Sequence, residues 1–196
     1  MPIRNPQSAI RNRIVVRGFT LIEAALTTVI ISTGVLAILS AQQAFHRKND
    51  WSQRIGTGMQ LANELREMTM VLPLNDPITG SENMGPEDNE LAVGDYDDLD
   101  DFAGTVAESG YGAGITFDPP INALRQPIDN MPGWSQKIEV ANVLPDNISA
   151  TTTQPLGTTE MVRVKVTVYY QSPQDAAKDI DPRVITTLSW VVGEQE

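Results

Sequence analysis

The residues in this chain that could do chemistry are almost all carboxylates. The densest group is a run of five aspartates within seven positions: Asp95, Asp97, Asp98, Asp100 and Asp101. Clustered carboxylate oxygens on a loop suit Ca²⁺, which takes six to eight oxygen ligands in a flexible geometry. The spacing is not that of an EF-hand, which needs a glycine at the sixth position and a glutamate at the twelfth. The sequence therefore predicts either a calcium site at these aspartates or a solvated acidic loop.

The sequence offers no catalytic constellation. His46 is the only histidine and there is no cysteine, so a Cys–His pair, a thiolate metal site and a disulfide are all ruled out. His46 stands beside Arg47 and Lys48, a basic trio that suits lipid phosphates. We expect a protein that is not an enzyme and that needs no cofactor apart from the calcium considered above.

The charge of the chain is acidic and unevenly distributed. Acids outnumber bases 25 to 14, a net charge of −11, so a nucleic-acid partner is not expected. Residues 1–18 contain four arginines and no acid, whereas residues 67–124 contain 13 acids and no lysine or arginine. This separation indicates that the two ends face different surroundings.

Residues 19–41 form one apolar run, FTLIEAALTTVIISTGVLAILSA, with a single charge. A helix of this length covers about 35 Å, enough to cross a bilayer. A cleaved secretory signal would have a shorter apolar core and a small-x-small site, which Leu39-Ser40-Ala41 does not supply. The four arginines before the run favour a cytoplasmic N-terminus, with the C-terminal domain on the periplasmic side of an inner membrane.

Glu23 is the one charge in this run. An ionised carboxylate in hydrocarbon costs on the order of several kcal/mol unless it is paired. Glu23 lies about one turn into the run, so it requires a cation. The alternative is an acid tolerated near the membrane surface.

Gly18-Phe19-Thr20-Leu21-Ile22-Glu23, with a basic leader before it and an apolar run after it, resembles the processing site of type IV prepilins and type II secretion pseudopilins. The resemblance implies that a prepilin peptidase removes residues 1–18 and methylates the new amine of Phe19. That amine would neutralise Glu23 of the same or a neighbouring subunit. The chain departs from many pilins in having Ser40 in place of a helix-bending proline, and in lacking a disulfide.

The helical pattern continues through residues 42–72 and predicts an amphipathic half of the same helix, ended by Pro73. One helix over 19–72 would be about 80 Å long. Its apolar positions recur three or four apart and predict one stripe that packs on the domain: Trp51, Ile55, Met59, Ala62, Leu65, Met68 and Leu72.

Residues 73–196 are expected to form the globular domain, with an acidic loop region at about 80–120 and antiparallel strands at about 134–193. Three alternating runs predict three strands with one buried face each. Their predicted inward residues are Trp134, Gln136, Ile138, Val140, Asn142 and Leu144; Val162, Val164, Val166, Val168 and Tyr170; and Val184, Thr186, Leu188, Trp190 and Val192. The expected fold is α+β, a long helix against a small antiparallel sheet, the lollipop of pilins.

By resemblance, the expected function is that of a minor pilin or minor pseudopilin in a type IV pilus or a type II secretion-like filament. The expected partners are other subunits through helix 19–72, the prepilin peptidase, the inner-membrane assembly machinery and the lipid bilayer. The alternative is an uncleaved single-pass membrane protein whose domain binds a ligand, with calcium as the candidate.

Overall fold

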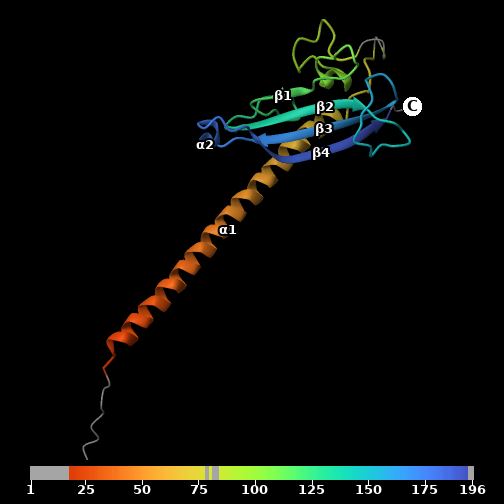
Figure 1. The fold of residues 1–196 in the computed structure, drawn as a ribbon. Helices are drawn as coiled ribbons and strands as arrows, with labels where there is room; N and C mark the ends of the chain where they lie inside the picture. Colours follow the sequence, from red (N-terminus) through yellow and green to blue (C-terminus); the bar gives the residue numbers. More distant parts are fainter. Residues whose placement is uncertain (1–17, 78–79, 81–83, 194–196) are drawn as a thin grey trace, which may run out of the picture. The chain divides into compact units, whose positions relative to one another are not determined.

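The computed structural model describes residues 18–77, 80 and 84–193. It has the predicted α+β fold, in which the C-terminal part of a long helix packs against an antiparallel sheet (Figure 1). The sheet has four strands in the order β1-β2-β3-β4, one more than the three predicted, because β1 precedes the predicted range. The chain divides between Asn49 and Asp50 into two compact units, and α1 contributes to both. The elements are α1 (Leu21–Thr69), η1 (Asp100–Ala103), β1 (Ile115–Phe117), β2 (Trp134–Asn142), β3 (Met161–Tyr170), α2 (Pro173–Ala176) and β4 (Arg183–Gly193).

The N-terminal unit consists of the first part of α1. Thr20 caps the helix, because its Oγ1 accepts the backbone N–H of Glu23 at 3.3 Å. Five hydroxyl groups inside the apolar run donate to carbonyl oxygens one turn back, at 2.7–3.1 Å: those of Thr27, Thr28, Ser32, Thr33 and Ser40. These bonds satisfy the polar groups within the helix, so the surface that remains is compatible with hydrocarbon.

The C-terminal part of α1 supplies one face of the core. Its buried residues are Gly58, Leu61, Ala62, Leu65, Met68 and Thr69. The helix ends at Thr69, before the predicted end at Leu72. Residues 70–72 form a turn in which the N–H of Leu72 donates to the carbonyl of Thr69 at 3.3 Å. The earlier end follows from Pro73, since a proline disfavours helical geometry in the residue before it.

The prediction of one continuous buried stripe from Trp51 onward is wrong. Trp51, Ile55 and Met59 are 45%, 37% and 39% exposed, and burial begins at Gly58. Two reasons combine: Trp51 lies on the same side of α1 as buried Thr69 but about two turns before Gly58, where burial begins, whereas Met59 is rotated by about 80° from Trp51 and so away from the buried face.

The predicted alternation holds through β2 and, with one exception, through β3. The buried inward side chains are Trp134, Gln136, Ile138, Val140 and Asn142 in β2, and Val162, Val164, Val166 and Val168 in β3. The exception is Thr167, which pairs with Lys137 and Thr187 on the outer face and is nevertheless buried. Leu144, predicted to continue the inward series, lies beyond the end of β2 and is 42% exposed. Ile138 pairs with Val166, which pairs with Leu188 of β4, so the inward residues form continuous rows across the sheet.

The predicted inward face of β4 is correct from Thr186 onward and wrong at Val184. Val184 is 52% exposed, and Ile185 is buried instead. A register shift between Val168 and Tyr169 of β3 explains this, because Tyr169 pairs with Val184 and Val168 with Thr186. The extra residue at this irregularity is Ile185, and it points into the core.

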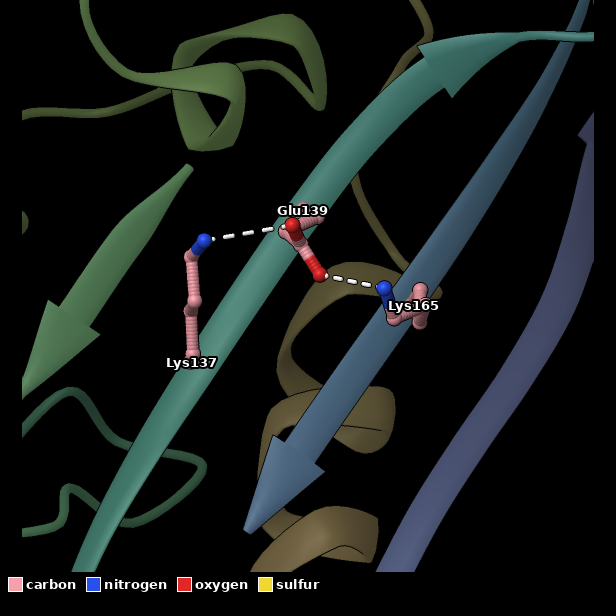
Figure 2. Close-up of polar contacts among 3 residues, drawn as sticks. All are labelled: Lys137, Glu139 and Lys165. Carbon is pink, nitrogen blue, oxygen red and sulfur yellow. Dashed lines mark hydrogen bonds and ion pairs between the residues drawn. The ribbon is translucent and has the colours of Figure 1, made fainter. Parts of the chain in front are cut away.

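The outer face of the sheet carries a small network of charges. Glu139 of β2 lies between two lysines, with Oε1 3.2 Å from Lys137 Nζ and Oε2 2.6 Å from Lys165 Nζ (Figure 2). Partial burial raises the pKa of Glu139, but the hydrogen bonds from the two lysines outweigh it and hold that pKa below the usual value. Such pairs contribute about 0.2–1 kcal/mol each, so they add only modestly to the stability of the sheet.

The buried side chain of Gln136, in the sheet, forms hydrogen bonds with both the helix and a loop. Its Oε1 accepts the N–H of Ile121 at 2.8 Å, and its Nε2 donates to the carbonyls of Leu61 and Ile121 at 2.8 and 3.2 Å. The side chain is fully buried, and these bonds offset the cost of placing an amide there.

Two glycines in α1 give a matched test of how the helix meets β4. A Cβ at Gly56 would have open space, whereas one at Gly58 would lie 2.9 Å from Ile185 Cγ2. We expect Gly56→Ala to raise the free energy of unfolding by up to about 1 kcal/mol, and Gly58→Ala to lower it by about 1 kcal/mol. Chemical denaturation measures both. Equal stabilisation by the two changes would contradict the close packing at Gly58.

Replacing Gln136 by methionine keeps the size of the side chain and leaves the buried N–H of Ile121 unpaired. We expect a loss of about 1–3 kcal/mol in the free energy of unfolding. Gln171→Met is the control, because Gln171 makes an exposed hydrogen bond to Ile180. A Gln136→Met protein as stable as the control would refute this role.

Candidate functional site

The predicted processing site lies just before α1. Gly18, Phe19 and Thr20 precede the helix and are exposed. No heavy atom outside the adjacent residues lies within 4 Å of the position that a Cβ would take at Gly18. The backbone between Gly18 and Phe19 is therefore open to another protein. The rest of the predicted leader, residues 1–17, lies outside the described residues.

Glu23 occupies the first turn of α1, and its side chain is exposed. Within the described part of the chain its carboxylate makes no ion pair and no hydrogen bond. The next charged residue along the helix is Arg47, more than six turns further on. Glu23 therefore requires a cation from elsewhere if this part of α1 lies in lipid.

The second candidate site is a group of six acidic residues, called here the buried acidic cluster because four of them are buried. It consists of the buried Glu90, Asp98, Asp100 and Asp101, the half-buried Glu87 and the exposed Asp97. Leu99 and Phe102 are fully buried and anchor this segment to the core, at the position of η1. The aspartates between these anchors are drawn inside with them. Asp98, Asp100 and Asp101 are 0%, 2% and 0% exposed, and Glu90 is buried as well.

Each of the three buried aspartates has one oxygen fixed by backbone amides. Asp98 Oδ1 accepts the N–H groups of Asp100 and Asp101 at 2.8 and 3.1 Å. Asp101 Oδ2 accepts those of Asp97 and Asp98 at 3.1 and 3.2 Å. Asp100 Oδ1 accepts the N–H of Gly85 at 2.9 Å. These bonds orient the carboxylates and prevent them from turning toward water.

The second oxygen of each buried aspartate is without a hydrogen-bond partner in the described structure. These atoms are Asp98 Oδ2, Asp100 Oδ2 and Asp101 Oδ1, and Glu87 Oε1 is in the same condition. A buried acceptor left unpaired costs about 1–3 kcal/mol, and more when it is charged. Four such atoms in one cluster are far from ordinary, since nearly all buried polar atoms are satisfied.

The carboxylates converge in two groups that share one residue. Oxygens of Asp97, Asp98 and Asp101 lie within 4.8 Å of one another, and so do oxygens of Glu87, Glu90 and Asp101. Asp100 is buried among them and acts on Asp98 and Glu87 through its charge. Asp101 is thus the centre of the cluster.

The structure brings together four of the five aspartates named from the sequence and separates the fifth. Asp95 is exposed, its Oδ2 accepts the N–H of Ala92 at 3.1 Å, and it belongs to neither group. Glu87 and Glu90 were not anticipated. The sequence signal that could have identified them is a pair of acids three positions apart in a stretch without any lysine or arginine.

Burial dominates the electrostatics of the cluster. It raises the pKa of Asp98 and of Asp100 to about 7, with their mutual repulsion adding to the rise for Asp98. Burial raises the pKa of Asp101 to about 8, helped by contact with Glu90. Burial and Glu90 likewise raise the pKa of Glu87 to about 7. The groups are therefore held against ionisation by each other and by the core.

The nearest basic side chain does not neutralise the cluster. Arg125 Nη1 donates to the carbonyl oxygens of Val93, Gly94 and Tyr96, at 3.1, 3.1 and 2.6 Å. Its charge lowers the pKa of Asp97 only slightly against larger opposing effects. None of the ion pairs in the described part of the chain includes a cluster residue.

Fold and sites together define an α+β domain on a helix that is long and apolar enough to span a membrane, with a mean hydropathy of 2.0 over its most apolar window. Searches against protein-family models, curated proteins and solved structures find no match to this chain.

The raised pKa values predict a pH dependence of stability in the presence of a chelator. Protonation of Asp98, Asp100, Asp101 and Glu87 stabilises the folded state, fully at pH values below their unfolded pKa of about 4, and this stability is lost as pH rises through 7 to 8. Within the cluster Glu90 raises the pKa of Glu87 and of Asp97, and Asp76 outside it acts in the same direction, whereas the charge of Arg125 lowers the pKa of Asp97. We expect the melting temperature in EDTA to fall from pH 5 to pH 8. A constant or rising value would contradict these shifts.

Proposed function

We propose that this chain is a type IV pilin-like subunit, a minor pilin or minor pseudopilin, which is cut between Gly18 and Phe19 and assembles into a filament through α1. The observation that carries the proposal is the apolar half of α1. It has one charge, Glu23, no buried residue and no cation for that charge among the described residues.

The apolar half of α1 requires a cover that the chain does not provide. Large side chains along it are mostly exposed, as at Leu26 (63%), Ile30 (62%) and Leu36 (63%). Burying apolar surface is worth about 25 cal/mol per Å², so a helix with this surface is not stable alone in water. Lipid covers it before assembly, and the helices of other subunits cover it in the filament.

Cleavage supplies the cation that Glu23 needs. The new amine of Phe19 stands four residues before Glu23, about 6 Å along a helix axis, so it reaches the carboxylate of its own or a neighbouring chain. In a low-dielectric surrounding, such a pair is favourable where either charge alone is costly. The pairing of Glu23 with the new amine would thus explain why the acid lies in the apolar run, why the leader is removed and how subunits assemble.

The exposed aromatic and apolar side chains beyond the membrane run support packing between helices. Phe45, Trp51, Ile55 and Met59 all remain exposed on α1 after the domain has formed its core. An unpaired apolar surface of this kind is typical of a contact with other chains.

The second candidate function is an uncleaved membrane-anchored domain that binds a ligand. The buried acidic cluster favours it, because the cluster is a specialised site that a purely structural subunit does not require. The two functions differ in whether the leader is removed and in whether Glu23 pairs with an amine during assembly.

Replacing Gly18 by leucine tests the cleavage. In a host with a prepilin peptidase, we expect the natural chain to begin at a methylated Phe19 and Gly18→Leu to keep its leader, because the added side chain blocks approach to the backbone. Gly34→Leu is the matched control, also at a glycine with open space around it. N-terminal sequencing and intact mass give the result. An N-terminus in the leader region of the natural protein would refute the proposal.

Replacing Glu23 by glutamine tests assembly. We expect Glu23→Gln to be processed and retained in the membrane, with incorporation into sheared filaments reduced at least about tenfold because the pair with the amine is lost. Glu67→Gln makes the same change at an exposed position of α1 and should assemble normally. Normal incorporation of Glu23→Gln would contradict the proposed pairing.

A further inference from the structure

We infer that the buried acidic cluster is a Ca²⁺ site at Asp101, the residue shared by its two carboxylate groups: Asp97 and Asp98 in one, Glu87 and Glu90 in the other. The inference stands independently of the filament function. It rests on the geometry and the unbalanced charge of the cluster.

The unpaired oxygens belong to side chains whose direction is fixed by hydrogen bonds to their other oxygen. Asp98 and Asp101 each use one oxygen for two backbone N–H groups and leave the other, Oδ2 and Oδ1 respectively, buried and unpartnered. This is the arrangement of a metal ligand whose direction is fixed by bonds to its second atom.

The second argument is distance. Oxygens bound to one Ca²⁺ lie about 2.3–2.6 Å from the ion, so two of them are at most about 5 Å apart. Each of the two groups satisfies this limit by itself, with its three ligand atoms within 4.8 Å of one another, and both include Asp101. The two groups therefore meet at Asp101, where a cation would find three converging carboxylates.

The third argument is charge. The five residues of the two groups and Asp100 are six carboxylates, and the sequence from residue 67 to residue 124 contains no lysine or arginine. Arg125, the first basic residue after this stretch, directs its guanidinium to backbone carbonyls. No ion pair within the described residues includes a member of the cluster, so a bound divalent ion would be its counter-charge once the carboxyl groups ionise.

The chemistry of the ligands selects calcium over magnesium. Several carboxylates from an irregular loop suit the larger ion, which accepts many ligands in varied geometry. Mg²⁺ demands near-ideal octahedral geometry and keeps most of its water, which this buried site does not favour. The ion would link the segment around Glu87 and Glu90 to the turn at residues 97–101 and so fasten the long connection between α1 and β1.

The test uses the full chain in a mild detergent, stripped of metal with EDTA and followed by near-UV circular dichroism on heating. We expect 1 mM Ca²⁺ to raise the melting temperature by about 5 °C or more over EDTA, and 1 mM Mg²⁺ to raise it far less. An equal melting temperature with Ca²⁺ and EDTA would overturn the site. An equal rise with Mg²⁺ would mean that the stabilisation is general screening of charge, and it would overturn the calcium site as well.

Variants separate the site from the loop that carries it. Asp101→Asn keeps an oxygen for the N–H groups of Asp97 and Asp98, so we expect it to fold, to lose the Ca²⁺-dependent rise, and to melt no lower than the natural protein in EDTA. Asp95→Asn, in the same loop but outside the cluster, should keep the full rise. Asp98→Asn repeats the test should Asp101→Asn fail to fold. A rise retained in the cluster variants, or lost in Asp95→Asn, would refute the assignment.

Discussion

The burial of one face of α1, from Gly58 to Thr69, is the interaction on which the domain depends. The helix brings only a few large side chains to the core, chiefly Leu61, Leu65 and Met68, and each is worth about 1.5–3 kcal/mol when buried. On the sheet, the buried valines of β3 form the other side of this core. No disulfide supports the contact, because the chain has no cysteine. The acidic connection between α1 and β1 is then held by its own buried anchors, Leu99 and Phe102.

The sequence predicts the fold where one rule of periodicity applies over many residues. The long helix and the inward faces of β2 and β3 follow from spacings of three to four and of two, and all three are present. The rules fail where geometry changes locally. A register irregularity turns Ile185 inward, and a strand as short as β1 has no pattern to detect. Periodicity also does not tell at which residue of α1 the packing on the domain begins, which leaves Trp51 and Ile55 exposed.

The candidate sites are predictable to the extent that their residues are neighbours in the chain. The aspartate run and the segment from Gly18 to Glu23 are visible as local patterns. Glu87 and Glu90 reach the same cluster across an irregular loop, and no periodic rule connects them to Asp101. Nor does the sequence state which aspartates are buried, because that depends on where Leu99 and Phe102 enter the core.

Gly58 and Gln136 together determine where α1 lies along its own axis on the domain. At Gly58 the helix backbone approaches Ile185 too closely for any side chain, and Gln136 donates to the carbonyl of Leu61. A slide by one turn, about 5.4 Å, would break that bond and drive a larger residue against Ile185. Sliding of α1 along the sheet is therefore opposed at two separate points of the helix.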